Sequence, residues 1–388
     1  MVKPNTIITD NITLNEFYNK CIKEKVLAVD TEFIRDNTYY PSLCLIQIAG
    51  ENFAAAIDPL SGLEMQPVWD LLANEKILKV FHAGRQDIEI FLHLTGEIPK
   101  PIFDTQIAAM FCGLGEQVGY EKLVNNFLDL SINKENQFTN WLQRPLTKNQ
   151  IEYAISDVTH LIKIYPLILK SIKDLNREDW VQKETEYLTN KNLYITDPMT
   201  AWERIKIKQL NRETLNYLKY LASWREIECK KRNVPRNRLI RDEVLVNIAV
   251  LKPREIDKLK KIRGISKNLS VADFYQILET IKQSSKYNSE QWPQINNTYK
   301  KKNVDKCSLE LLKLLLSYCS EKSGLAQKLI ADTEDLRNVL LNPNKNHGMF
   351  IGWRNKIFGN YVKLLLDGKL AFTIENNRIK KIDFEHKY

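Results

Sequence analysis

Residues 25–33, KVLAVDTEF, decide how the first half of this 388-residue chain folds. A short apolar run containing two valines leads directly into Asp30-Thr31-Glu32, which predicts a buried strand that ends in two acids. Side chains two positions apart on a strand point to the same side, so Asp30 and Glu32 project together. Two such carboxylates are unfavourable unless a cation lies between them. The other interpretation of this common pattern is an exposed strand terminus.

The sequence on both sides of this strand alternates strand and helix patterns. Short apolar runs predict further strands over residues 43–49, 53–58 and 77–82. Helical periodicity predicts helices over residues 65–74 and in the segment after Gly84. This order is typical of an α/β domain in which helices flank a mixed sheet. Such sheets usually carry ligands at the carboxyl ends of their strands.

From residue 119 onward the chain is predicted to be almost entirely helical. A long helix over residues 148–165 should end near Pro166, because proline removes a backbone donor from the helix. Polarity and periodicity divide the chain into an α/β domain at 1–170, a connector at 171–203, a helical domain at 204–283, a polar linker at 284–304 and a second helical domain at 305–388.

Composition excludes several classes of protein. A hydrophobic content of 44% is too high for a disordered chain. No apolar run reaches the roughly 18 residues that a membrane helix needs. The N-terminus lacks the apolar core of a secretory signal, so a cytoplasmic protein is predicted. The six cysteines include no C-x-x-C pair, which argues against a disulfide framework and a cysteine zinc site.

Charge is distributed unevenly along the chain. Residues 1–200 have a net charge of −8 and residues 201–388 a net charge of +17, for a total of +9. An acidic half can hold cations and a basic half can hold a polyanion, which favours a nucleic-acid partner. A general lysine bias is the alternative, but it would not leave the first half acidic.

Two further motifs supply acids. Tyr153 and Asp157 are four residues apart in a predicted helix, so both lie on one helical face. Asp87 follows a buried strand and lies in the first turn of a predicted helix. Each motif alone also has an ordinary interpretation, as a packing tyrosine beside a solvated acid or as an acid favoured by the helix dipole.

Together and in this order, VDTEF, HAGRQDIEIF and YAISDV resemble the three exonuclease motifs of the DEDD superfamily, in the subtype with tyrosine in the last motif. The strings RDNTYYPSLCLIQIA and WLQRPLTKNQIEYAISDV are further similar to the ribonuclease D family. Residues 208–266 resemble an HRDC domain, and residues 305–386 resemble a second, divergent copy. The resemblance implies a ribonuclease H-like α/β nuclease domain followed by two all-α HRDC-type domains.

The resemblance also implies a role for each motif residue. Asp30, Glu32, Asp87 and Asp157 correspond to the ligands of two divalent cations, Mg²⁺ or Mn²⁺, and Tyr153 completes the catalytic set. Four packed carboxylates repel one another, and hard dications offset that charge and hold the scissile phosphate. Tyr153 is a poor base at neutral pH, since a free tyrosine has a pKa of about 10. It is therefore expected to orient the attacking water.

Other residues are candidates for contact with RNA. Thr31, Phe33 and His82 adjoin the motifs, although a core role for Phe33 and simple packing for His82 are the alternatives. Asp104 begins a predicted helix, where an N-cap is the ordinary explanation. The densest basic cluster is expected to bind phosphates without base specificity, and it contains Lys230, Lys231, Arg232, Arg236, Arg238 and Arg241.

The resemblance implies a 3′→5′ exoribonuclease that acts on RNA with a free 3′ end and releases nucleoside 5′-monophosphates, with tRNA precursors as substrates. The sequence indicates no membrane association and no obligate protein partner. A DNA 3′→5′ exonuclease is one alternative, because the same five residues serve DNA in relatives. A non-catalytic RNA-binding protein on the same scaffold is the other.

Overall fold

A computed structural model of the chain describes residues 6–132, 139–206, 210–266, 268–293, 304–343 and 345–384. The N-terminal region is built on a six-stranded mixed sheet with the strand order β1-β4-β3-β2-β5-β6. Strand β2 lies antiparallel to β3 and parallel to β5. The strands are β1 (Thr6–Ile8), β2 (Val26–Ile34), β3 (Ser42–Ala49), β4 (Ala54–Ile57), β5 (Leu78–Phe81) and β6 (Ile102–Asp104).

The sheet confirms the strand pattern of the sequence and adds two short edge strands. The four predicted strands correspond to β2, β3, β4 and β5. Strands β1 and β6 are three residues long and lie at the two edges of the sheet, where a short strand leaves little periodic signal. The acidic strand β2 therefore lies in the interior of the sheet, flanked by two strands that bury its backbone.

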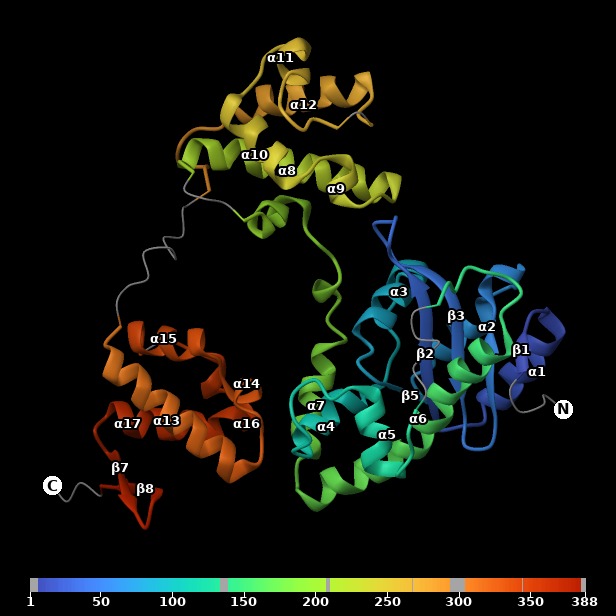
Figure 1. Ribbon diagram of the computed structural model, residues 1–388, viewed down its shortest axis with the longest axis vertical. Coiled ribbons are helices and arrows are strands. Elements are labelled where there is room, and N and C mark those ends of the chain that lie inside the picture. The colour runs from blue at the N-terminus through green and yellow to red at the C-terminus, as the bar shows by residue number, and fades with distance from the viewer. Residues whose placement is uncertain are drawn as a thin grey trace.

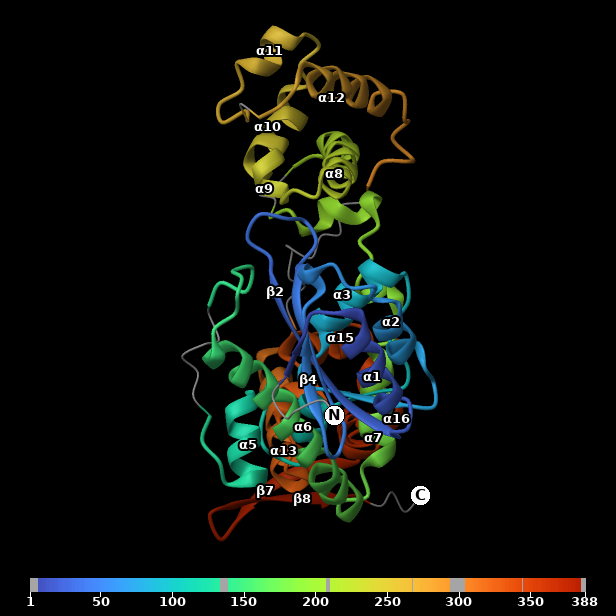
Figure 2. The same cartoon turned by 90° about the vertical axis from the view of Figure 1, so that its right-hand side faces the viewer.

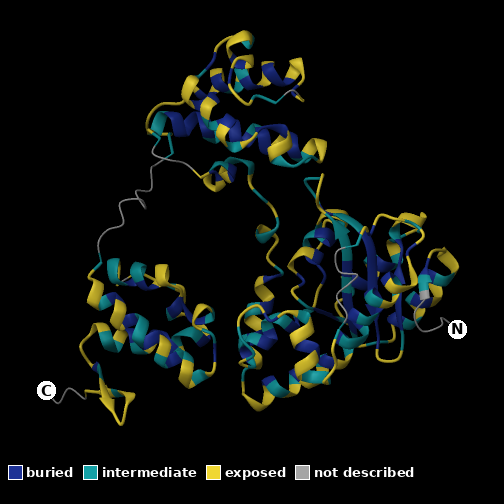
Figure 3. Cartoon of the chain, viewed as in Figure 1, coloured by how far each residue is buried: buried dark blue, intermediate teal, exposed yellow. Residues whose placement is uncertain are grey.

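Helices cover both faces of the sheet, whose central strands are buried (Figure 3). Leu14, Val68 and Phe91 pack on one face and come from three different helices. Ala154 and Val158 pack on the other face, against Ala28 and its neighbours. The helices of this region are α1 (Asn11–Cys21), α2 (Gln66–Ala73), α3 (Arg85–Thr95), α4 (Thr105–Phe111), α5 (Tyr120–Leu128), α6 (Lys148–Asp174) and α7 (Glu178–Tyr187).

Helix α6 is longer than the sequence predicted. It begins with a capping box of Thr147 and Gln150, but it continues through Pro166 instead of ending there. Ile164, Ile168 and Ile172 are spaced four apart and are all buried, so packing of this apolar stripe stabilises the helix beyond the proline. Tertiary contacts outweigh the loss of a backbone hydrogen bond at this position.

A middle helical region follows the connector and contains the basic cluster. Its core is formed by residues such as Leu218, Leu245 and Ile277, from three helices. Residues 294–303 of the predicted linker at 284–304 lie outside the described residues. The helices of the middle region are α8 (Arg212–Arg232), α9 (Arg236–Leu239), α10 (Asp242–Leu251), α11 (Ile256–Lys260) and α12 (Val271–Ser284).

The C-terminal region is helical and ends in a β-hairpin. The sequence predicts a second, all-α helical domain at 305–388, and the hairpin departs from that prediction. Asn376 and Asn377 both have positive φ angles, 51° and 57°, as a tight two-residue hairpin turn requires. The elements are α13 (Lys306–Ser323), α14 (Gln327–Ile330), α15 (Thr333–Leu341), α16 (Gly352–Arg354), α17 (Asn360–Leu366), β7 (Leu370–Glu375) and β8 (Arg378–Asp383).

The C-terminal region packs directly on the N-terminal region. The rings of Trp180 and Trp353 stack with centroids 5.6 Å apart, and Phe111 meets Trp353 edge-on at 5.1 Å. Gly113 has a φ of 79°, and a Cβ there would lie 3.0 Å from the carbonyl oxygen of Gly324. This close packing forms one hydrophobic core across the two regions, so deleting the C-terminal region would expose an apolar face of the N-terminal one.

The three regions lie at the corners of a triangle (Figure 1). The turned view keeps the middle helical region at one end of the molecule and the other two regions at the opposite end (Figure 2). None of the described helices has the length and apolarity to span a membrane. All six cysteines are free thiols.

Candidate active site

The structure brings three carboxylates together at the centre of the sheet. Asp30 and Glu32 project from β2, and Asp157 projects from α6, which covers that face of β2. One ligand oxygen from each residue lies within 4.8 Å of the others. Residues 127 positions apart in the chain, such as Asp30 and Asp157, meet because α6 crosses the sheet over β2.

The fourth predicted acid, Asp87, is connected to this cluster through Thr31. Thr31 points to the opposite side of β2 from its two acidic neighbours. Its hydroxyl donates a hydrogen bond to Asp87 Oδ1 in the first turn of α3. Asp87 is buried, and its charge is one of those that act on Asp30. Thr31, which the sequence analysis treated as a nucleotide-binding candidate, is thus engaged in holding an acid of the cluster.

Burial raises the pKa of every acid in the cluster, and repulsion from the other acids raises it further for Asp30 and Glu32. Burial, followed by the charges of the other three acids, raises the pKa of Asp30 well above its usual value. Burial is also the largest cause for the others, and it raises the pKa of Glu32 to about 9, of Asp157 to about 7 and of Asp87 to about 6. Among the described residues, no cationic side chain is a main cause of any of these shifts, so the negative charge of the cluster is largely uncompensated.

The cluster fits a divalent cation. Its donors are carboxylate oxygens, which hard ions such as Mg²⁺ and Mn²⁺ prefer. Asp157 Oδ1 is buried and has no hydrogen-bond partner among the described residues, so an acceptor is left free in the middle of the cluster. A buried acceptor without a partner is costly, and a bound cation would satisfy it.

Tyr153 lies one helical turn before Asp157 and forms a hydrogen bond with its carboxylate. Its ring packs beside Trp141, with centroids 6.3 Å apart. Burial, together with the charges of Asp157 and Glu32, raises the pKa of Tyr153 above its ordinary value. In the metal-free protein the phenol therefore remains protonated at neutral pH, which suits it to donating a hydrogen bond.

Two residues of the site escaped the sequence analysis. The hydroxyl of Tyr120, at the start of α5, donates to the backbone carbonyl of Asp157, which ties α6 to α5 beside the acidic cluster. Gln47 pairs with Asp30 across the strands β2 and β3, and it is completely buried with both amide atoms unpartnered among the described residues. A glutamine within the apolar run of residues 43–49 was a usable signal, because a polar residue in a buried strand is rarely placed there for packing.

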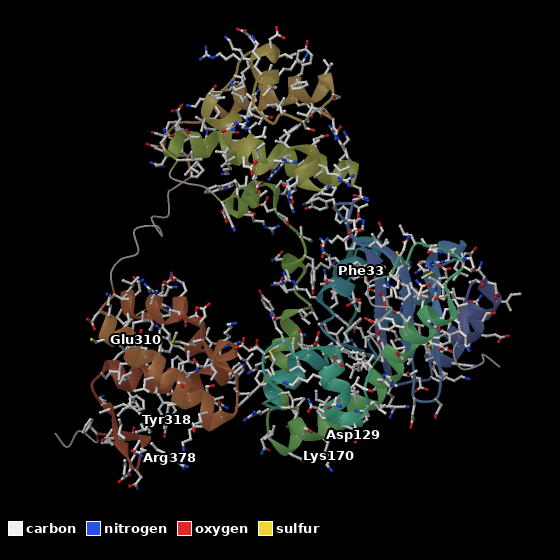
Figure 4. All side chains as sticks on the ribbon, viewed as in Figure 1. Phe33, Asp129, Lys170, Glu310, Tyr318 and Arg378 are labelled. Atoms are coloured by element: carbon white, nitrogen blue, oxygen red, sulfur yellow. The ribbon has the colours of Figure 1, made fainter. Side chains whose placement is uncertain are left out.

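The remaining candidates near the motifs have structural partners. His82 Nδ1 lies 3.0 Å from Thr105 Oγ1, and burial lowers its pKa, so the neutral ring is held by packing. Asp104 accepts hydrogen bonds from the backbone of Gln106 and Gly84 at 2.8 and 2.9 Å, which makes it the N-cap of α4. Phe33 is half-buried near the end of β2 that leads toward the middle helical region (Figure 4).

Four of the six predicted basic residues use their charges within the protein. Arg232 forms ion pairs with Glu228 and Asp273, and Arg236 pairs with Glu226. Arg238 donates to the side chain of Asn37, and Lys230 donates to the carbonyl of Thr196 at 2.6 Å. Lys231 and Arg241 are exposed and form no ion pair within the described part of the chain. Of the six, these two have the cationic groups most available to a phosphate.

Arg144 fixes the segment that leads into α6. Its guanidinium donates two hydrogen bonds to Asp58, at 2.6 and 2.7 Å, and others to the carbonyls of Trp141 and Cys44. Asp58 follows strand β4, so Arg144 ties the start of α6 to the sheet. The register of Tyr153 and Asp157 over β2 depends on this attachment.

We expect Arg144→Ala to lower the free energy of unfolding by about 3–5 kcal/mol, because Asp58 would remain as a buried charge with no cationic partner and only the backbone N–H of Leu60 to donate to it. The side chain of Asp58 is only 3% exposed. Lys148→Ala is the control, since Lys148 is 86% exposed and its ion pair should contribute little. Urea denaturation measures the unfolding midpoint of each variant. The same midpoint for Arg144→Ala and Lys148→Ala would contradict the role of Arg144.

Cation binding should become stronger as the pH rises. The folded-state pKa values of Asp87, Asp157 and Glu32 lie above those of the unfolded chain, which are about 4. The metal-free protein therefore loses stability as the pH rises from about 4 to about 9, while a bound cation requires the ionised forms. We expect Mn²⁺ to raise the melting temperature more at about pH 8.5 than at about pH 6. The same increase at both pH values would contradict this electrostatic account.

Comparisons with known proteins agree with this arrangement. A family model described as a 3′-5′ exonuclease matches residues 5–173, and an HRDC domain model matches residues 214–281. Ribonuclease D of Zymomonas mobilis is 44% identical to this chain over 96% of its length and 97% of the relative. Ribonuclease D of Sphingobium indicum is 41% identical over 96% of this chain and 97% of the relative.

The crystal structure of Escherichia coli RNase D is also similar. It matches with a TM-score of 0.79 and 28% sequence identity, over 93% of this chain and 98% of that one. Both the sequence and the arrangement of the regions are therefore shared along nearly the whole length. The chain belongs to the ribonuclease D family, whose nuclease domain is a 3′→5′ exonuclease.

Proposed function

We propose that this protein removes nucleotides one at a time from the 3′-hydroxyl end of RNA and releases nucleoside 5′-monophosphates. The observation that carries the proposal is the cluster of Asp30, Glu32 and Asp157 within 4.8 Å, in a chain of the ribonuclease D family. Asp87 joins the cluster through the hydroxyl of Thr31. An acidic cluster that has no cationic partner in the described part of the chain is suited to metal-dependent phosphodiester hydrolysis.

The four carboxylates would hold two divalent cations, Mg²⁺ or Mn²⁺. Such ions supply an activated water and stabilise the charge that develops on the leaving 3′-oxygen. The protein's own contribution is positioning. Tyr153 keeps its proton and lies beside Asp157, so its hydroxyl can hold the attacking water by a hydrogen bond.

Folded RNAs with single-stranded 3′ ends are the proposed substrates, with tRNA precursors the specific class. The E. coli protein of similar structure is described as an exoribonuclease involved in structured RNA processing. In this chain residues 201–388 have a net charge of +17, which favours binding of a polyanion such as a folded RNA. We further propose the domain boundaries 1–170, 204–283 and 305–388, with the second helical domain as a divergent HRDC copy.

The test is a time course on a tRNA precursor with a 3′ extension, in Mg²⁺, in Mn²⁺ and in chelator. We expect stepwise shortening from the 3′ end, mononucleotide products, a stop near the folded RNA and no reaction in chelator. A matched DNA oligonucleotide distinguishes the DNA exonuclease alternative, which predicts faster loss of DNA. Absence of mononucleotides with both metals would leave only the non-catalytic RNA-binding alternative.

A further inference from the structure

The loop between β2 and β3, residues 35–41, extends out of the nuclease region and contacts the middle helical region (Figures 1 and 2). The ring of Tyr39 packs against the hydrophobic core of that region, beside residues of α8 and the connector. We call residues 35–41 the strut. It begins three residues after Glu32, so the strand that carries two of the catalytic acids continues directly into the contact.

A buried charge lies at the centre of the contact. Glu226 on α8 is completely buried, and its carboxylate accepts hydrogen bonds from the hydroxyl of Tyr39 and from Arg236. Arg236 donates two of these bonds, at 2.5 and 2.6 Å, and a third to the Tyr39 hydroxyl at 3.0 Å. Its guanidinium also lies over the Tyr39 ring, 5.0 Å from the centroid. A buried carboxylate is costly unless its hydrogen bonds are made, and Tyr39 can reach Glu226 only when the strut lies in this position. The network therefore favours one position of the strut.

Neighbouring contacts hold both ends of the strut. The backbone N–H of Tyr40 donates to Asn233 Oδ1 at 3.0 Å, and Asn37 accepts a hydrogen bond from Arg238. On the nuclease side, the ring of Tyr40 stacks on His93 of α3, with centroids 3.6 Å apart and planes at 9°. Arg35 pairs with Glu89 of the same helix at 2.8 and 2.9 Å. The strut is therefore braced on α3 at its base and on the helical region at its tip.

This contact attaches the two regions at a point away from the chain connections. The chain connects them directly through residues 188–211, and it also continues from the middle helical region into the C-terminal region, which packs on the nuclease region. A contact at a separate point restricts rotation about these connections. Tyr39 is seven positions after Glu32 in the chain, and even a fully extended chain of this length spans only about 25 Å. The helical region is thus held close to the acidic cluster and in one orientation.

We propose that the strut is a specificity determinant, because it sets the length of single-stranded 3′ tail that a folded RNA must present to be trimmed. A duplex that rests on the helical region is held at a fixed distance from the acids, so shortening stops at a defined tail length. The proposal depends on the exoribonuclease function proposed above. It assigns Tyr39 and Glu226 a positioning role, and neither touches the acidic cluster.

The experiment uses the full-length protein and RNA hairpins that differ only in 3′ tail length, beside a short unpaired RNA. The variants are Tyr39→Ala, Tyr39→Phe and Glu226→Gln, with Tyr187→Ala as control because Tyr187 is 60% exposed on α7. We expect wild type and control to stop at one tail length. Tyr39→Ala and Glu226→Gln should give a spread of tail lengths and a kcat/KM about tenfold lower on the hairpins. Activity on the unpaired RNA should not change.

Amide hydrogen exchange provides a readout besides activity. Tyr39→Ala should increase exchange at the Tyr40 amide, and Tyr39→Phe, which keeps the ring and loses the hydroxyl, should show a smaller effect in both assays. If Tyr39→Ala increases exchange but leaves the stop position and the rate on hairpins unchanged, the proposal is overturned. Unchanged exchange at the Tyr40 amide in this variant also overturns it. If wild type fails to shorten the unpaired RNA, the proposed exoribonuclease function fails instead.

Discussion

Replacing Asp30 with asparagine is expected to abolish metal-dependent hydrolysis. The substitution keeps the size of the side chain and removes one negative charge from the cluster. Loss of a ligand that the cations require removes several kcal/mol of transition-state stabilisation, which corresponds to a decrease of at least about 10³-fold in kcat/KM. Release of mononucleotides from a short RNA in Mg²⁺ or Mn²⁺ measures the effect. Asp157→Asn should behave in the same way.

The same substitution should make the metal-free protein more stable. Burial and the charges of the other acids raise the pKa of Asp30, so the wild-type protein bears the cost of burying this acid at pH values above the ordinary aspartate pKa of about 4, and asparagine removes that cost. We expect a higher melting temperature for Asp30→Asn than for wild type without metal, and a smaller increase on adding Mn²⁺. Glu51→Gln, at an exposed turn, is the control for a simple change of charge. Full activity of the Asp30→Asn variant, in a preparation that contains no contaminating nuclease, would refute the assignment of the site.

Tyr153→Phe is expected to lower turnover by about 10²–10³-fold, because the hydroxyl beside Asp157 is lost while the ring remains. The packing of the ring beside Trp141 is preserved, so folding should not change. Metal affinity should also be almost unchanged, since the four carboxylates are intact. Single-turnover kinetics on a short RNA measure the rate of the chemical step, and isothermal titration with Mn²⁺ measures the affinity.

Tyr165→Phe is a matched control on the same helix. Tyr165 packs edge-on against Phe103 at 5.2 Å, away from the acids, and removing its hydroxyl should leave the turnover unchanged. Wild-type turnover in Tyr153→Phe would show that the hydroxyl does not position the reacting groups. A strong loss of Mn²⁺ affinity would instead point to a structural role for Tyr153 in holding Asp157.

Local patterns predicted the central part of the fold. The apolar runs over residues 43–49 and 77–82 identified real strands, because a strand buried on both faces needs apolar residues at every position. The same reasoning failed for Pro166, where three buried isoleucines stabilise the helix beyond the proline, and for the C-terminal hairpin. In both places the secondary structure depends on contacts between side chains or strands that come together only in the folded protein.

The basic cluster shows the same difference between pattern and structure. A count of charges between Lys230 and Arg241 cannot tell a cation that faces solvent from one that is paired. The structure pairs Arg232 and Arg236 with carboxylates and leaves Lys231 exposed. It also reveals the contact of Tyr39 with Glu226, two residues 187 positions apart whose interaction no local pattern indicates.

The residue types of the acidic motifs and their local directions follow from the primary structure. A strand has a period of two and a helix a period near four, so Asp30 is aligned with Glu32, and Tyr153 with Asp157, wherever those elements lie. The distance between the two pairs depends on how α6 crosses the sheet, and the position of the helical region depends on the strut. Periodicity is a property of the backbone alone, whereas convergence depends on which distant surfaces bury one another, and only the folded chain settles that.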